Sequence, residues 1–189
     1  MADTTTNSTK VVTGKVRFSY AHVFEPTSME EGGAQKYSVC LLIPKDDATT
    51  LDKIKKAIEA AKQLGKAKLA NKSGQLPPDA SLKLPLRDGD IERSDDENFA
   101  GCMFINATST RKPSIVDKNL DPIMEQEEFY SGCYGRASIN FYAFNVQSKG
   151  VAAGLNNLQK LADGEPLTGG STASEDFGGE NSWADDELM

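Results

Sequence analysis

Histidine and cysteine are scarce in this sequence. It has one histidine, His22, and three cysteines, Cys40, Cys102 and Cys133, which lie far apart and form no C-x-x-C pair. These are too few soft ligands for a structural zinc site, and an odd, scattered set of cysteines does not form a disulfide framework. We therefore expect no metal, no other cofactor and a reducing, cytoplasmic environment.

Long hydrophobic runs are also missing. The segment Met1 to Lys10 is polar and rich in threonine, and no stretch approaches the roughly 18 apolar residues that a membrane span needs. The sequence therefore predicts neither an export signal nor a membrane partner. With 189 residues, of which 38% are hydrophobic, the chain suffices for one folded domain and an appendage.

Positive charge is absent from the end of the chain. Eight acids and no Lys or Arg follow from Asp163 onward, whereas residues 1–162 carry 20 acids and 21 bases. The net charge of −7 thus belongs to the tail, and the bases of a near-neutral body are free to gather on one face. No apolar periodicity survives after Asp163, so residues 163–189 are predicted to be a disordered acidic tail and residues 1–9 a disordered leader.

Alternating apolar and polar residues predict strands through the body of the chain. The segments that alternate are 10–20, 35–43, 101–110 and 132–145. In the first of them Val12, Val16, Phe18 and Tyr20 are expected on the core side. Two further segments are less regular: 82–86 is read as a short strand in an exposed connection, and 151–161 either as a closing strand or as a helical turn.

One amphipathic helix is predicted after the second strand. Asp46 or Asp47 is a suitable N-cap. Apolar residues then recur at three- and four-residue steps, at Leu51, Ile54, Ile58, Ala61 and Leu64, and lysines take the other face, at Lys53, Lys55, Lys56 and Lys62. The fold expected for residues 10–162 is mainly β, a single OB-like Greek-key β-barrel with this helix inserted. A standard OB-fold carries its helix after the third strand instead.

Bases and aromatic rings occupy the predicted outer side of several strands. Exposed rings on a basic sheet suit single-stranded nucleic acid, because unpaired bases stack on rings while Lys and Arg neutralise phosphates. Alternatively, an aromatic residue on a strand packs in the core or across strands. The residues predicted to bind DNA are Lys15, Arg17, Lys36, Phe104, Arg111, Lys112, Tyr134, Arg136 and Tyr142.

The tail combines acids with exposed apolar anchors. It ends with the only tryptophan of the chain, Trp183, followed by Asp185, Asp186, Glu187, Leu188 and Met189. Such a strip suits docking onto a basic groove, either on a replication partner or on the DNA site of the protein itself. The alternative is a tail that serves only solubility.

An enzyme is the first competing interpretation. The acids Asp88, Asp90, Glu92, Asp95, Asp96 and Glu97 begin like a calcium loop. However, Arg93 stands where the turn glycine belongs and Phe99 where the closing glutamate belongs, so a solvated loop is favoured. Gly65-Lys66 is not a phosphate loop either, because position 60 is alanine, and no catalytic pairing stands out. The second competing interpretation is a protein-interaction or virion assembly module.

Several segments resemble the single-stranded-DNA-binding family of tailed phages. They are 14–20 (GKVRFSY), 36–45 (KYSVCLLIPK), 132–145 (GCYGRASINFYAFN) and 150–167 (GVAAGLNNLQKLADGEPL), followed by a Gly-rich acidic end. The resemblance implies an OB-fold that coats single-stranded DNA in the host cytoplasm, without catalysis, during phage replication, recombination or repair. It also implies a tail that recruits replication or recombination proteins. Edge strands offer a route to a homo-oligomer, although no pattern selects it.

Overall fold

The structure is a computed structural model that describes residues 9–28, 32–146 and 148–167. Five long strands carry the fold: β2 (Val16–Thr27), β3 (Lys36–Pro44), β5 (Cys102–Ser109), β7 (Tyr134–Val146) and β8 (Ser148–Ala162). No helix of the described residues is long and apolar enough to cross a membrane.

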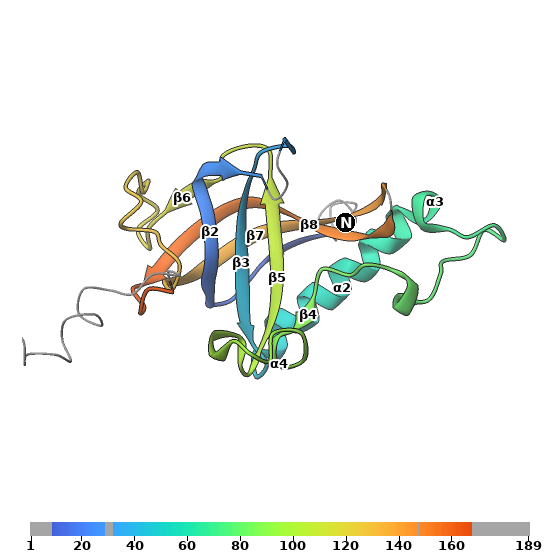
Figure 1. Cartoon of the computed structure of the whole chain (residues 1–189), viewed down its shortest axis with the longest axis horizontal. Coiled ribbons are helices and arrows are strands. Elements are labelled where there is room, and N and C mark those ends of the chain that lie inside the picture. Colours follow the sequence, from blue (N-terminus) through green and yellow to red (C-terminus); the bar gives the residue numbers. More distant parts are fainter. Residues whose placement is uncertain (1–8, 29–31, 147, 168–189) are drawn as a thin grey trace, which may run out of the picture.

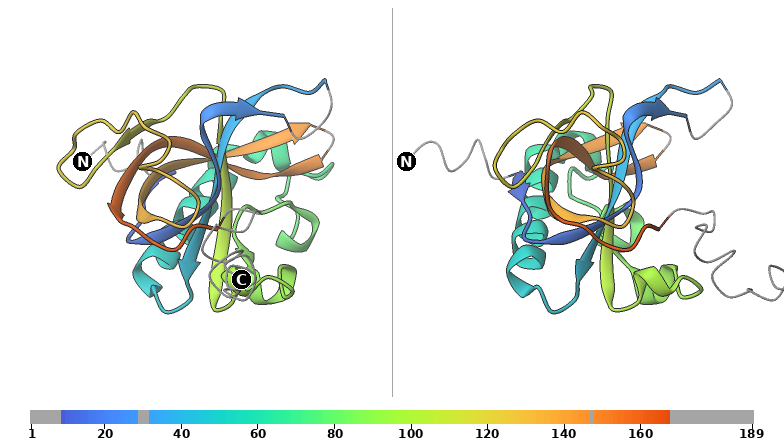
Figure 2. Two further views of the ribbon diagram at one scale, coloured as in Figure 1. Left: turned by 60° about the vertical axis from the view of Figure 1, so that its left-hand side comes forward. Right: turned by 90° about the vertical axis from the view of Figure 1, so that its left-hand side faces the viewer.

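The pairings of these strands close the sheet into a barrel. β2 pairs with β3 and β3 with β5, both antiparallel, while β5 and β8 are parallel neighbours. β8 forms a long antiparallel hairpin with β7, and β7 returns to β2. This is the strand order of an OB barrel, so the predicted mainly β, OB-like fold is confirmed. Figures 1 and 2 show the strands curving around one core.

Shorter elements decorate this barrel. The strands β1 (Lys10–Val12), β4 (Arg87–Asp88) and β6 (Ser114–Val116) pair with β7, β5 and β8, respectively. The helices are α2 (Ala48–Leu64), α3 (Lys66–Leu69) and α4 (Gly89–Glu92), with 3-10 turns at Asp79–Ser81 and Glu97–Phe99. The segment 87–101, which contains α4, folds at the ends of β3 and β5 (Figure 1).

Helix α2 lies between β3 and β5 in the sequence, as predicted. The side chain of Asp47 caps it by accepting a hydrogen bond from the backbone N–H of Thr50 at 3.1 Å. Two positions depart from the predicted faces. Leu64 is 71% exposed, whereas Lys62 is buried and pairs with Glu59 and Asp79.

The predicted first strand is in fact two strands. Residues 13–15 interrupt the strand, and the Thr13 hydroxyl accepts a hydrogen bond from the backbone N–H of Ala137 at 3.0 Å. The break shifts the alternation, so that Val11 is buried and Val12 is 40% exposed. The prediction for Val12 is therefore wrong, because the alternation of buried and exposed side chains in β2 does not continue into β1 across the interruption.

Other strand predictions are settled by pairing. The segment 151–161 is strand, within β8, because it pairs along its length with β7. The segment 82–86 is not a strand; it makes one isolated bridge, between Lys83 and Gly150. On β7 the expected core side chains, Cys133 to Ala143 at alternate positions, are all buried.

A second apolar cluster lies on the outer side of β3 and β5. It consists of Cys40, Leu42, Phe99 and Phe104. Segment 87–101 folds back and brings the Phe99 ring edge-on to Phe104, at 5.1 Å between centroids. Phe104 is consequently 5% exposed. The prediction that this ring lies open for base stacking is wrong, because the segment directly before β5 folds back and covers it.

Candidate functional site

An irregularity in β2 changes which side chains point outward. Ser19 pairs with Cys40 and His22 with Ser38, so three steps along β2 match two steps along β3. This is the count of a β-bulge. Tyr20, inside the bulge, has a positive φ of 46° and is 51% exposed. The expectation that Tyr20 lies on the core side is thus wrong, because the bulge reverses the alternation at this residue.

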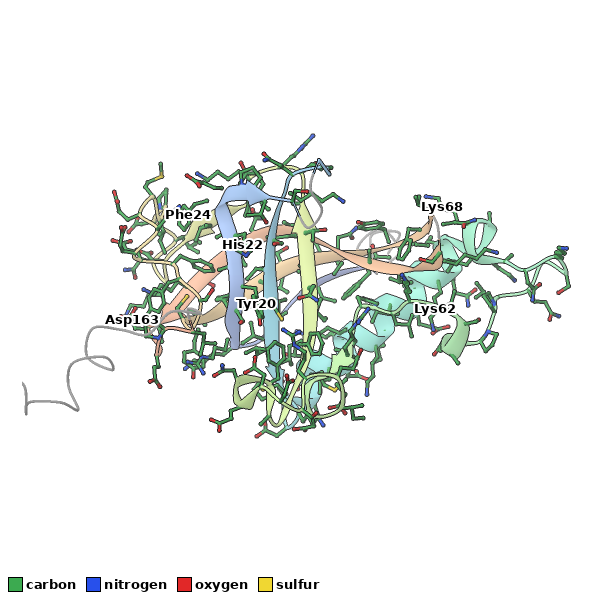
Figure 3. All side chains as sticks on the ribbon, in the orientation of Figure 1. Tyr20, His22, Phe24, Lys62, Lys68 and Asp163 are labelled. Carbon is green, nitrogen blue, oxygen red and sulfur yellow. The ribbon has the colours of Figure 1, made fainter. Side chains whose placement is uncertain are left out.

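A row of rings follows from this reversal. Beyond the bulge Val23 is buried, whereas His22 is exposed and Phe24 is half-buried. Tyr20, His22 and Phe24 follow one another along β2 in Figure 3. Phe24 also packs partly against the core, and the Lys112 Nζ lies 5.6 Å from its ring centroid. Three rings are therefore presented along one strand at a spacing of two residues.

Small polar side chains continue this surface across the barrel. Ser38 on β3 pairs with Thr108 on β5, and Thr108 pairs with Gly154 on β8. Asn106, also on β5, is exposed. Tyr142 of β7 is 44% exposed, and its ring lies where a Cβ on Gly154 would meet it at 3.6 Å. We call this surface the open face; its members are Tyr20, His22, Phe24, Ser38, Asn106, Thr108, Tyr142 and Gly154.

Arg93 borders the open face at Tyr20. Its Nη2 donates a hydrogen bond to the Tyr20 hydroxyl, and its guanidinium lies 4.7 Å from the centroid of Phe99. The Arg93 Nε is buried and has no hydrogen-bond partner among the described residues. The arginine therefore ties segment 87–101 to the row of rings and keeps a positive charge beside it.

Cations gather where β3 begins and β5 ends. Lys36, Arg111 and Lys112 are all exposed. Beside them is a groove of about 490 Å³ whose lining includes Arg111, Lys112, Lys10 and Asn156. Of the predicted DNA-binding residues, Lys36, Arg111, Lys112 and Tyr142 thus lie on or beside the open face.

Of the other predicted residues, Phe104 belongs to the outer cluster, and a further cluster near the first residues of β2 and β7 consists of Lys15, Arg17, Tyr134 and Arg136. The Tyr134 ring has Lys15 Nζ at 5.1 Å and Arg17 Cζ at 5.4 Å from its centroid. Arg136 Nε donates to the Thr13 carbonyl at 3.1 Å.

Arg17 pairs with Leu42, which pairs with Phe104, so Arg17 lies on the same side of the sheet as the outer cluster. Tyr134 and Arg136 lie near the start of β7, whereas Tyr142 lies towards its other end. That all of these residues share one DNA-binding surface stays a prediction.

Residues 163–167 form a strap across the start of β7. Arg17 Nη2 donates to the Glu165 carbonyl at 2.7 Å, and the backbone N–H of Leu167 donates to the Ser131 carbonyl at 2.7 Å. The Tyr130 hydroxyl donates to the Gly164 carbonyl at 2.9 Å. Folded structure thus continues past the predicted boundary at residue 162, and Leu167 packs against the outer cluster on β3 and β5.

The predicted partner-binding tail falls outside the described residues. This holds for Trp183, Asp185, Asp186, Glu187, Leu188 and Met189. The strap ends beside the outer cluster, so the chain that continues from Leu167 starts from the same side of the barrel as the open face.

The cysteines and the acidic segment have identifiable local environments. Burial raises the pKa of the Cys40 thiol to about 12 and also raises the pKa of Cys133, which disfavours a reactive thiolate. In the acidic segment, Lys45 Nζ bridges Asp88 at 2.8 Å and Asp90 at 2.7 Å and holds the pKa of both carboxyls below the usual range. Within the described part of the chain, no three His, Cys, Asp or Glu side chains are placed to hold a metal ion.

Sequence reasoning missed Tyr20, His22, Phe24, Arg93 and Lys10 as site residues. The alternation Tyr20-x-His22-x-Phe24 is visible in the sequence, but only the bulge turns it outward. Arg93 carries no sequence signal for this position, because the folding of segment 87–101 brings it to Tyr20.

Comparison with known proteins gives one consistent result. A family model described as "Enterobacter phage Enc34, ssDNA-binding protein" matches residues 9–189. Protein p50 of Acyrthosiphon pisum secondary endosymbiont phage 1 is 33% identical over 185 residues, which cover 95% of this chain and 98% of that protein.

Solved structures agree with these sequence matches. The single-stranded DNA-binding protein of bacteriophage Enc34 in complex with ssDNA is 31% identical, with a TM-score of 0.69 over 85% of this chain and 90% of that chain. gp2.5 of bacteriophage T7, a single-stranded DNA-binding protein, is 13% identical with a TM-score of 0.62 over 86% of this chain and 97% of that chain, a likeness of fold alone.

Proposed function

The chain belongs to the family of the ssDNA-binding protein of Enterobacter phage Enc34, and from this premise we propose that it binds single-stranded DNA across its open face. The observation that carries the proposal is the row of rings on β2, which faces Tyr142 of β7 across a polar strip. In OB-folds this side of the second and third barrel strands, here β3 and β5, is the usual oligonucleotide surface.

Stacking on the rings provides a grip that does not depend on sequence. Every base has a flat π-face, and each base stacked on an aromatic side chain contributes about 1–3 kcal/mol. Tyr20, Phe24 and Tyr142 are the rings placed for this role, with His22 between the first two. Paired bases inside a duplex offer no such faces, so the surface selects unpaired strands.

Phosphates are neutralised by the cations around the rings. Lys36 and Lys112 lie at one end of the open face and Arg93 at the other. Ser38, Asn106 and Thr108 have short side chains that leave the strand room to lie across β3 and β5. This arrangement supports binding with little sequence preference and with an affinity that falls as salt rises.

The biological role that fits is coating of single-stranded phage DNA. We assign the protein to replication, recombination or repair in the cytoplasm of the infected host cell, as a binding protein without catalysis. Its family and the rings and cations of the open face support this role over that of a virion assembly module, because a virion assembly module does not require exposed rings among cations.

The acidic tail regulates this surface in our proposal. The strap is held by Arg17 and Tyr130 and delivers Leu167 to the outer cluster on β3 and β5, next to the open face. The sequence beyond it carries six acids and no base. It competes with DNA for the cations of the open face, and when DNA displaces it the segment from Trp183 to Met189 recruits replication or recombination proteins.

Fluorescence anisotropy tests the proposed function. Labelled oligo-dT, a duplex of the same length and an RNA strand are titrated with the full chain at two salt concentrations. We expect binding to oligo-dT that weakens with salt and is far tighter than binding to the duplex. Equal affinity for duplex and single strand, or no binding to any of them, would contradict the proposal.

A further inference from the structure

The groove beside the open face has the composition of a site for a phosphodiester backbone. Its lining includes Asn156 and Asn157 of β8, Ser114 of β6 and the cations Lys10, Arg111 and Lys112. None of the side chains that line it is acidic. Three cations and several amide or hydroxyl groups around about 490 Å³ match the charge and the acceptor oxygens of phosphates.

These cations are not engaged by carboxylates. Among the described residues, no ion pair involves Lys10, Arg111 or Lys112. The loop after β5 is set by a hydrogen bond from the backbone N–H of Arg111 to the Ser109 hydroxyl at 3.0 Å. Within the part of the chain that the structure describes, positive charge therefore stands around the groove without a carboxylate in an ion pair with it.

The groove is continuous with the open face through Lys112. The Nζ of this residue lies over the Phe24 ring, at the end of the aromatic row, and the same side chain lines the groove. Ser109, the last residue of β5, also lines the groove, one position after Thr108 of the open face. A DNA strand that extends beyond Phe24 at this end of the open face would therefore reach the cations of the groove.

We propose that this groove is a second anchoring site for the phosphate backbone of the same DNA strand, separable from the stacking rings and reached only by longer strands. The inference rests on the proposed function, because it concerns the continuation of the strand bound there. Short strands are held by the open face alone, and longer ones gain contacts with Lys10 and Arg111. Affinity thus rises in a step when the strand becomes long enough to enter the groove.

The test compares strands of graded length on two variants of the full chain. Lys10→Gln with Arg111→Gln removes two groove cations and keeps Lys112, which also serves the open face. Lys53→Gln with Lys55→Gln is the matched control, since both of these lysines are exposed on α2 and the charge change is the same. Oligo-dT of about 4 to about 16 nucleotides spans the site sizes known for OB-folds.

The groove variant is expected to bind the shortest strands within about twofold of the unmodified protein and the longest strands at least tenfold more weakly. For long strands the slope of log affinity against log salt should flatten by about 1.4, since each lost phosphate contact on a single strand contributes about 0.7. The control variant should change the affinity of long strands by less than about threefold.

The outcomes separate this inference from the proposed function. If the groove variant loses affinity equally for all lengths, or for none, the groove is not a separate anchor, although the open face still binds DNA. If the unmodified protein binds no oligo-dT of any length, the proposed function itself is wrong. Thermal unfolding of each variant checks that the fold is retained.

Discussion

Arg93 and Tyr20 hold each other in place at the edge of the open face. The Arg93 Nη2 donates a hydrogen bond to the Tyr20 hydroxyl at 2.9 Å, and the guanidinium carbon lies 5.5 Å from the Tyr20 ring centroid. Tyr20 in turn lies 6.5 Å from Phe99, between ring centroids. A residue in the left-handed region of φ thus has its ring fixed by a loop that comes from 73 residues further along the chain.

The first prediction concerns this pair. Tyr20→Ala should weaken oligo-dT binding by about 1–3 kcal/mol, or roughly 5- to 150-fold, because one stacking ring is lost. Arg93→Ala should weaken it less, by freeing the ring and removing one charge. In the double variant the effects should fall short of additivity by about 0.5 kcal/mol or more, since the residues are in contact. Additive losses in anisotropy titrations would show that Arg93 does not position Tyr20.

A second prediction separates the two clusters of rings and cations. Tyr142→Ala should reduce the affinity for oligo-dT about tenfold, in the range of one lost stacking contact, because this ring borders the open face. Arg136→Ala should have a smaller effect, since this side chain lies beside Thr13 in the other cluster. Anisotropy titrations at one salt concentration measure the oligo-dT affinity of both variants. A larger loss from Arg136→Ala would indicate that the DNA binds at the cluster around Tyr134 instead of the open face.

A third prediction addresses the tail with two truncations. Removal of residues 168–189 deletes six acids and should strengthen oligo-dT binding at low salt, with the difference shrinking at high salt. Removal from residue 163 also deletes the hydrogen bonds of the strap to Arg17 and Tyr130, so it should in addition lower the melting temperature. Weaker DNA binding by the shorter truncation would contradict competition by the tail.

A fourth prediction concerns the close approach of β7 and β8. A Cβ on Gly135 would stand 1.9 Å from the Gln159 carbonyl oxygen and 2.9 Å from the Phe18 ring, so Gly135→Ala should destabilise the barrel by about 1–3 kcal/mol. Gly154→Ala is the control, because its Cβ would meet atoms only at 3.5 Å or beyond. Its cost should stay within about 0.5 kcal/mol in chemical denaturation. Equal stability of the two variants would show that the strands separate without cost.

A fifth prediction uses the ion pairs of the acidic segment. Lys45 holds the pKa of Asp90 below its ordinary value, and the backbone N–H of Gly101 adds a second hydrogen bond. A lowered pKa in the folded state means that the carboxylate stabilises the fold above its ordinary pKa, and that this stabilisation is lost as pH falls through the folded value. Asp90→Asn should therefore unfold more easily than the unmodified protein at pH 7.

The difference between the two proteins should begin to shrink as the pH falls below about 4, the ordinary range of aspartate, and should be lost only as the pH passes the lower pKa of the folded state. Denaturation curves at pH 7 and in steps down to pH 3 measure this. Lys53→Gln, which changes an exposed lysine on α2, is the control and should track the unmodified protein. A difference that stays the same size from pH 7 down to pH 3 would exclude the Lys45 ion pair as its cause.

The sequence by itself determined several elements of the barrel. Strict alternation identified β7 and its buried side chains, and the periodic run after Asp46 and Asp47 identified helix α2, because both signals depend on neighbours within a few residues. The uneven distribution of acids was equally plain, since charge is a property of composition. The resemblance to phage single-strand binders also came from short segments.

Only the tertiary structure decided which rings face outward. Phe104 has the alternation of an exposed strand residue, yet Phe99 covers it, because the segment directly before β5 folds back over the outer side of the strand. Tyr20 reads as a core residue and is exposed, because one extra residue in β2 reverses the side to which each later side chain points. The fold-back of a loop sets the first outcome and the register between β2 and β3 sets the second, and a periodic pattern carries no record of either.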